Sequence, residues 1–142
     1  MAHTMSHDEW RAFVTQGTRT AKVSTVRADQ APHVAPVWFL LDGDDLVFTT
    51  GKETVKGRNL TRDQRVAICV DDDRPPFAFV TLTGRAELSD DLADLRKWAT
   101  RIAARYMGAD HAEEFGARNA VPGEVLVRVH IDRVVAMAGL AD

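Results

Sequence analysis

The sequence lacks the features that mark several common classes of protein. Its 142 residues include a single cysteine, Cys69, so no internal disulfide can form. No apolar run approaches the length that is needed to cross a bilayer. The opening residues, MAHTMSHDEW, contain no apolar stretch like the centre of a signal peptide. We therefore expect a cytoplasmic protein with no membrane partner.

Charge and motifs exclude further classes. The chain carries 18 Lys and Arg against 21 Asp and Glu, and this net charge of −3 argues against nucleic acid as the main partner. The five histidines show no metal-ligand spacing. No GxGxxG or Walker A pattern occurs, and the βαβα repeat of a doubly wound nucleotide-binding fold is missing. The expectation is a small globular protein without a metal site.

The remaining composition is that of an ordinary globular chain. With 45% apolar residues it should form one domain over residues 1–142. Residues 1–5 are expected to be disordered or to derive from cloning, with Met5 as a second candidate for the native start. Cys69 lies in the apolar run VAICV, which favours a buried and unreactive thiol.

Alternating apolar and polar residues predict a mainly β protein with short helices. The six expected strands cover residues 21–26, 33–41, 46–50, 65–73, 77–88 and 123–138. Pro36 implies an edge strand or a bulge, and the last strand should switch its buried face near Asp132. Since the strands come in hairpin runs, the sheet should be mostly antiparallel, and closing it into a barrel would remove its edges.

Short helices are expected between these strands. Ser6 and Glu9 form a capping box for a helix that Gly17 stops. A second helix should cover Glu53 to Arg62. Ser89 should cap a third, over residues 90–107, and residues 111–119 suggest a further helical turn. In the third helix, apolar residues recur at helical spacing and predict a packed stripe: Leu92, Leu95, Trp98, Ile102 and Tyr106.

The segment TTGKETVKGRNLTRD, residues 49–63, concentrates cations in an acidic chain. Hydroxyl groups and Gly51 end a strand, and a helix follows. Backbone amides at a helix start, hydroxyls and cations together make an anion site. Lys52, Lys56 and Asn59 fall at i, i+4 and i+7, so they should share one helix face. Gly57 leaves room for a ligand or a packed strand. An ordinary solvated helix face is the alternative.

The segment LVFTTGKETVKGRNLTRDQRVAICV resembles the matching part of the pyridoxamine 5′-phosphate oxidase-like family of flavin-binding split barrels. TVRADQAPHVAPVWF is similar to the family's first hairpin, and VTLTGRAEL to a later barrel strand. The resemblance is best to the actinobacterial group that uses coenzyme F420, a 5-deazaflavin. It implies a six-stranded split β-barrel that forms a homodimer, with a cofactor in each cleft at the subunit interface.

The resemblance also implies roles for particular residues near the cofactor phosphate. Lys56 and Arg58 would bind the phosphate itself. Thr49 and Thr50 would hydrogen-bond the phosphate or the ribityl-type chain. The others would extend this network: Asn59 and Lys52.

Near the ring of the cofactor, the resemblance implies a second set of contacts. Backbone groups of Ala35, Pro36 and Val37 would pair with its pyrimidine edge, and Trp38 would wall the cleft. Pro76 and Phe77 would come from the second subunit.

The implied chemistry is hydride transfer from reduced F420 to a small electron-poor organic substrate, with the proton donor left open between His33 and solvent. Val55 stands where FMN-binding relatives tend to carry a second cation, which favours F420 over FMN. Two alternatives remain on the same fold. One is an FMN-binding oxidoreductase, and the other is a non-catalytic carrier of F420, haem or another tetrapyrrole. For haem, the candidate ligands are His33 and His130.

Overall fold

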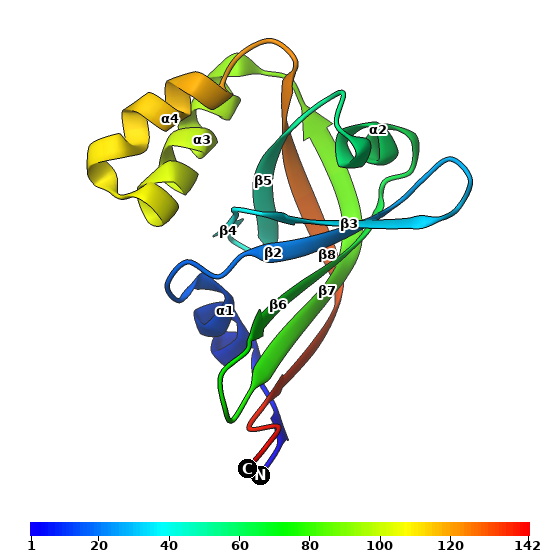
Figure 1. The fold of residues 1–142 in the computed structure, drawn as a ribbon, viewed down its shortest axis with the longest axis vertical. Helices are drawn as coiled ribbons and strands as arrows, with labels where there is room; N and C mark the ends of the chain where they lie inside the picture. Colours follow the sequence, from blue (N-terminus) through cyan, green and yellow to red (C-terminus); the bar gives the residue numbers. More distant parts are fainter.

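The fold, described here from a computed structural model of residues 1–142, is a curved antiparallel sheet with four α-helices at its margins (Figure 1). Its strands are β1 (His3–Thr4), β2 (Ala21–Val26), β3 (Pro32–Val37), β4 (Leu40–Asp42), β5 (Asp45–Gly51), β6 (Arg65–Asp72), β7 (Ala78–Ser89) and β8 (Glu124–Ala138). Its helices are α1 (His7–Thr15), α2 (Val55–Arg62), α3 (Leu92–Met107) and α4 (Ala112–Asn119), with a 3₁₀ turn, η1 (Ala109–His111), before α4.

The strand order explains how the sheet closes. Neighbouring strands follow the order β3-β2-β6-β7-β8-β5-β4, and β1 adds to β8. Every pair is antiparallel, as expected. The two strands at the ends of this order, β3 and β4, follow one another directly in the chain, joined by Trp38 and Phe39. The sheet must therefore curl until its ends meet.

The expected number of strands, six, was too low. The predicted strand over residues 33–41 divides into β3 and β4, because the chain leaves the sheet at Trp38 and Phe39. The other additional strand is the two-residue β1, in which His3 pairs with Ala138. Met5, just beyond it, is buried, so the expectation of a disordered start is wrong for residues 3–5.

The core lies inside the curl of the sheet. Alternate residues of β2 are buried, as the sequence pattern predicted. Phe39, Phe48 and Leu82 are among the largest side chains that are fully enclosed. On β6 the same alternation turns Ile68 inward and leaves Cys69 half-buried on the outer face, so the expectation of a fully buried thiol is wrong. Removing a core aromatic such as Phe48 would cost about 3–5 kcal/mol.

Pro36 and Asp132 occupy the positions that the sequence indicated. Pro36 lies in β3, an end strand of the sheet, where a missing amide hydrogen does not interrupt a ladder on both sides. Where β8 pairs with β7, Thr83 lies opposite Arg133 and Gly84 opposite Ile131, so Asp132 of β8 has no partner. This bulge changes the buried face of β8 at Asp132. Gly84 is required at this bulge, because a Cβ atom on it would stand 2.1 Å from the carbonyl oxygen of His130.

The helices begin and end close to their predicted limits, with one correction to a cap and one to a packed face. The Ser6 hydroxyl accepts a hydrogen bond from the Glu9 amide at 3.1 Å, which confirms that cap of α1. The predicted cap of α3 was two residues early: Ser89 still belongs to β7, and the carboxylate of Asp91 caps the helix. Leu92 is exposed, so the packed stripe of α3 begins only at Leu95.

The hairpin of α3 and α4 covers one end of the sheet beside β5 and β8 (Figure 1). Leu95 and Trp98 of α3 pack with Val47 and Leu126 in a second, smaller apolar cluster. This contact fixes α3 against β5 and β8. No helix in the structure has both the length and the apolar character that spanning a membrane requires.

Candidate functional site

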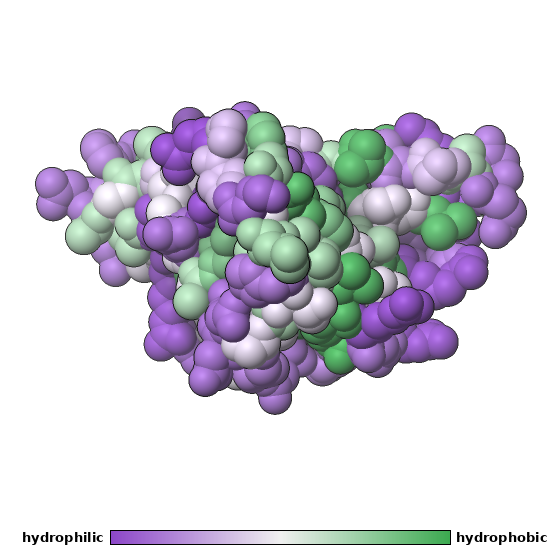
Figure 2. Space-filling view, turned by 90° about the horizontal axis from the view of Figure 1, so that it is seen from below, coloured by the Kyte–Doolittle hydropathy of each residue, from purple (hydrophilic) through white to green (hydrophobic).

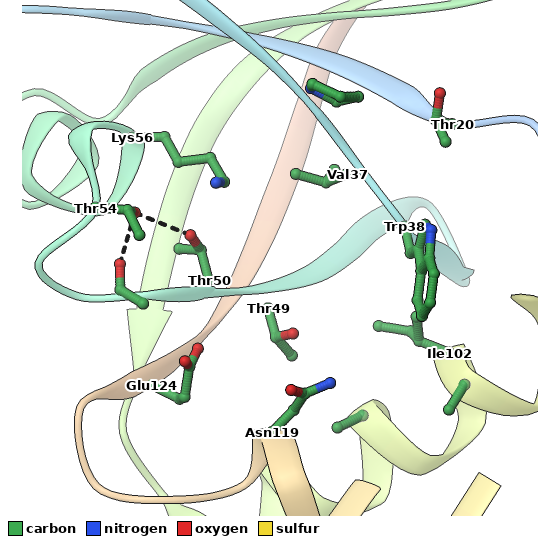
Figure 3. Close-up of a pocket in the computed structure, with 14 residues that line it drawn as sticks. Thr20, Val37, Trp38, Thr49, Thr50, Thr54, Lys56, Ile102, Asn119 and Glu124 are labelled. Atoms are coloured by element: carbon green, nitrogen blue, oxygen red, sulfur yellow. Dashed lines mark hydrogen bonds between the residues drawn. The ribbon is translucent and has the colours of Figure 1, made fainter. Parts of the chain in front are cut away.

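A cleft of about 420 Å³ opens where three parts of the fold meet (Figure 3). One wall is the corner at which β5 turns into α2. A second is the end of β3 with Trp38. The third comes from α3, α4 and the first residue of β8. This arrangement places hydroxyls, a lysine and a carboxylate around an otherwise apolar hollow.

The β5–α2 corner is held by a network of hydroxyl groups. Thr54 is the N-cap of α2: its side-chain oxygen accepts from the Gly57 amide at 3.1 Å and donates to the Gly51 carbonyl at 2.7 Å. The Thr50 and Thr54 hydroxyls are 3.1 Å apart and hydrogen-bonded. The sequence placed the helix start at Glu53, so α2 begins two residues later than expected.

Gly57 lets α2 approach the strand end closely. A Cβ atom at this position would stand 2.2 Å from the Gly51 carbonyl oxygen and 2.8 Å from that of Lys52. Of the two uses that the sequence suggested for Gly57, room for a ligand or for a packed strand, the structure shows the second. The close approach places the first turn of α2 at the edge of the cleft (Figure 3).

Lys56 is the cation of the cleft. Its half-buried side chain points into the hollow from the first turn of α2 (Figure 3). None of the hydrogen bonds of the structure involves its ammonium group, and no carboxylate oxygen lies within 4.0 Å of it. A partly desolvated cation without a partner, next to a helix start and hydroxyl groups, suits an anionic ligand.

The other cations of residues 49–63 lie elsewhere. Lys52 precedes the helix and lines a separate cavity of about 570 Å³, so the prediction that it shares a helix face with Lys56 is wrong. Arg58 is exposed and pairs with Glu53 at 2.9 Å. The structure thus brings only Lys56 of this group to the cleft.

Asn59 supports the fold from beneath the helix. It is buried, donates to the Thr25 hydroxyl at 3.0 Å and accepts from Arg62 at 3.0 Å. The bond to Thr25 ties α2 to β2, and the bond from Arg62 lies within α2. The roles of Asn59, Arg58 and Lys52 toward a cofactor stay predictions.

Three of the four residues expected beside the cofactor ring in this chain lie on the strand side of the cleft. Pro36, Val37 and Trp38 line the hollow, together with Thr49 and Thr50 on the opposite wall. Ala35 is half-buried one residue before them and does not line it.

Trp38 is held by aromatic neighbours. Its indole stacks on Tyr106, with ring centroids 5.1 Å apart and an interplanar angle of 3°. Phe115 lies edge-on at 6.4 Å. The Tyr106 hydroxyl donates to the Arg19 carbonyl at 2.7 Å and accepts from the Phe39 amide, and burial raises the pKa of this phenol. Trp38 is 37% exposed, so it offers a fixed apolar face to a ligand.

Pro76 and Phe77 lie far from the cleft of their own chain, in the β6–β7 loop near the chain termini (Figure 1). The Phe77 carbonyl accepts from the Leu140 amide at 3.2 Å, which fixes the loop against the C-terminus. The expectation that these residues act at a partner's cleft therefore depends on a dimer and remains a prediction.

Several lining residues were missed by the sequence analysis. They are Thr20, Thr54, Ala99, Ile102, Ala103, Asn119 and Glu124. Thr54 carried a usable signal, because threonine is a favoured N-cap just before a helix. Glu124 and Asn119 carried none, since Glu124 reaches the cleft through the pairing of β8 with β5 and Asn119 through the packing of α4. Burial raises the pKa of the Glu124 carboxyl, and the charge of Lys56 partly offsets this.

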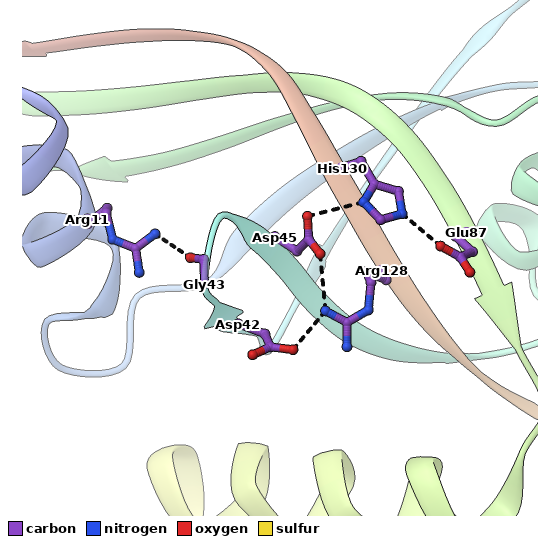
Figure 4. A network of polar contacts seen from close by, with 7 residues as sticks. All are labelled: Arg11, Asp42, Gly43, Asp45, Glu87, Arg128 and His130. Atoms are coloured by element: carbon purple, nitrogen blue, oxygen red, sulfur yellow. Dashed lines mark hydrogen bonds and ion pairs between the residues drawn. The ribbon is translucent and has the colours of Figure 1, made fainter.

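The two candidate histidine ligands, His33 and His130, do not line the cleft. Both ring nitrogens of His130 contact carboxylates on the outer surface, Glu87 at 2.7 Å and Asp45 at 3.2 Å (Figure 4). His33 lies on β3 and does not line the cleft. No group of three or more His, Cys, Asp and Glu side chains is arranged to hold a metal ion.

Comparison with known proteins places this site in a family. The sequence model of the family described as pyridoxamine 5′-phosphate oxidase matches residues 6–138 of this chain. The chain belongs to the pyridoxamine 5′-phosphate oxidase family. A curated member, the F420H2-dependent biliverdin reductase of Mycobacterium tuberculosis, is 31% identical over 139 residues, which are 95% of this chain and 90% of the relative.

Solved structures of the family share this fold. A conserved hypothetical protein of Mycobacterium tuberculosis has a TM-score of 0.82 at 26% identity, with 93% of this chain and 84% of that chain covered. An F420 reductase has a TM-score of 0.68 at 25% identity, with 87% and 94% covered. The fold is thus the split barrel of this oxidoreductase family, as the resemblance implied.

Proposed function

We propose that this protein is a reductase that uses reduced coenzyme F420 to transfer a hydride to a small, electron-poor organic molecule. The observation that carries the proposal is the unpaired Lys56 ammonium beside the hydroxyl groups of the β5–α2 corner. Two relatives support the proposal. An F420H2-dependent biliverdin reductase and an F420 reductase are each similar to most of this chain.

The cleft fits F420 at the phosphate end. Lys56 would contact the cofactor phosphate, and Thr49 would donate a hydrogen bond to the phosphate or to the hydroxylated chain. Thr50, whose proton goes to Thr54, would accept a hydrogen bond from the hydroxylated chain. The backbone around Pro36 and Val37 would face the ring. Trp38, fixed by its stack on Tyr106, would close that side.

When bound, reduced F420 supplies the hydride. The side chains of this protein orient the ring and exclude water from it. Ala99, Ile102 and Ala103 of α3 give the cleft an apolar floor, which suits a planar conjugated substrate. Biliverdin, on which the curated relative acts, is the first substrate to test. His33 lies outside the cleft, so solvent is the proposed source of the proton.

A homodimer is the second part of the proposal. On the outer face of the sheet, Cys69 of β6, Thr81 of β7 and Val135 of β8 pair in one row, and Val135 is 41% exposed. At the end of the molecule that carries both termini, apolar side chains gather between hydrophilic ones (Figure 2). Exposed Phe77 and Leu140 belong to that end. An apolar surface of this kind suits a partner subunit.

Multiple-turnover kinetics test the proposed activity. The purified protein is mixed with F420H2 and biliverdin, and the return of oxidised F420 is followed by its absorbance. Reoxidation over many turnovers, dependent on protein and on substrate, is expected. Tight binding of F420 without turnover of any electron-poor acceptor would instead indicate a carrier protein, and turnover with FMN alone would indicate a flavoenzyme.

A further inference from the structure

Glu124 stands beside the Lys56 corner of the cleft. It is the first residue of β8 and pairs in register with Gly51, the last residue of β5. Its Oε1 atom lies 3.7 Å from the place that a Cβ atom on Gly51 would occupy. The Lys52 amide donates to the Gly123 carbonyl at 2.8 Å, which holds the start of β8 against the corner. The carboxylate therefore faces the same space as the Lys56 ammonium (Figure 3).

Glu124 differs from the other glutamates of the chain in having no partner. Each of the other five lies within 4.0 Å of a basic side chain: Glu9, Glu53, Glu87, Glu113 and Glu114. Those side chains are exposed, whereas Glu124 is half-buried and its pKa is raised by burial. A partly desolvated carboxylate without a hydrogen bond is costly for the fold, so a role in the cleft is the natural explanation.

Glu124 and Lys56 are the only ionisable side chains among the residues that line the cleft. Their charges sum to zero when both are ionised. A ligand phosphate placed near Lys56 thus meets attraction from one charge and repulsion from the other. Both effects grow with the charge of the phosphate, so the carboxylate of Glu124 subtracts more from the binding of a dianion than from that of a monoanion.

We propose that Glu124 determines which kind of phosphate the cleft accepts, favouring a phosphodiester over a phosphomonoester. This inference rests on the proposed function, since it concerns the cofactor phosphate. The phosphate of F420 is a diester with one negative charge. The phosphate of FMN is a monoester with a charge of about −1.5 to −2 at neutral pH. Glu124 therefore selects F420 by opposing the extra charge of FMN.

The test is a paired binding titration with an isosteric variant. Dissociation constants for F420 and for FMN are measured by fluorescence in one buffer for the parent, Glu124→Gln and Glu113→Gln. Glutamine keeps the shape of the side chain and removes the charge. Glu113 is exposed on α4 and outside the cleft, so its variant controls for net charge. The expected result is a fall of about tenfold in the preference for F420 in Glu124→Gln, because the binding of FMN tightens more than the binding of F420. Glu113→Gln should keep the preference of the parent.

The outcomes separate this inference from the proposed function. A parent that prefers F420, with the same preference in Glu124→Gln, would overturn the role of Glu124 and leave the F420 assignment intact. An equal loss of preference in Glu113→Gln would also overturn it, because the effect would then belong to net charge. A parent that binds neither cofactor, or that prefers FMN, would overturn both. Thermal melting of Glu124→Gln is expected to show no loss of stability, since no partner is lost.

Discussion

Replacing Lys56 with alanine should weaken the binding of F420 strongly and leave the fold intact. Lys56 is the one cation that lines the cleft, and its ammonium has no partner within the protein. Two unit charges about 4 Å apart interact by about 4 kcal/mol at the effective dielectric of a protein surface. Because Lys56 is half-exposed, solvent screens part of this attraction. We therefore take the loss of binding free energy in Lys56→Ala as that of one charged hydrogen bond, about 1.5–3 kcal/mol.

That loss corresponds to an increase of about 10- to 150-fold in the dissociation constant. The assay is fluorescence titration of the purified protein with F420. Lys56→Arg keeps the charge and should recover part of the affinity. Lys97→Ala is the matched control, because Lys97 is exposed on α3 and lies 5.4 Å from the Trp98 ring rather than in the cleft. Binding of F420 to Lys56→Ala as tight as to the parent would refute the phosphate role of Lys56.

Three further predictions concern the stability of the parts that shape the cleft. Gly57→Ala should lower the melting temperature despite the better helix propensity of alanine, because overpacking against the strand end costs about 1–3 kcal/mol; an unchanged melting temperature would contradict the close packing. Asn59→Ala should cost about 1–3 kcal/mol in urea unfolding through the loss of buried hydrogen bonds, and a cost near zero would show that they are not needed. The hydrogen bond that protonated His130 donates to Glu87, together with Asp45, raises the pKa of His130 above its ordinary value of 6.5. The stabilisation from His130 is therefore present below pH 6.5 and is lost as pH rises through the raised pKa. His130→Gln should therefore destabilise by less than about 1 kcal/mol near pH 5 and by still less near pH 8, and a cost that rises with pH would contradict this sign.

The parts of the fold that depend on local patterns were predicted well. The antiparallel sheet followed from alternation such as that in AKVSTV, and the edge position of β3 from Pro36. The hydroxyl groups and Lys56 at the β5–α2 corner could be recognised because they are close together in the sequence. Local chemistry alone indicated an anion site there.

The parts that depend on packing between distant segments were not predicted. Gly57 draws α2 onto the strand end, which leaves Lys52 outside the helix and sends Asn59 into the core. The α3–α4 hairpin reaches the cleft because Leu95 and its neighbours pack on β5 and β8, and Glu124 reaches it because β8 pairs with β5. A sequence pattern holds no information on which distant residues will meet in this way.

The central claim is that the cleft binds F420 in preference to FMN. Its most direct test is a paired fluorescence titration of the purified parent protein with F420 and with FMN in the same buffer. The account predicts tight binding of F420 and weaker binding of FMN. Tighter binding of FMN, or binding of neither cofactor, would contradict it.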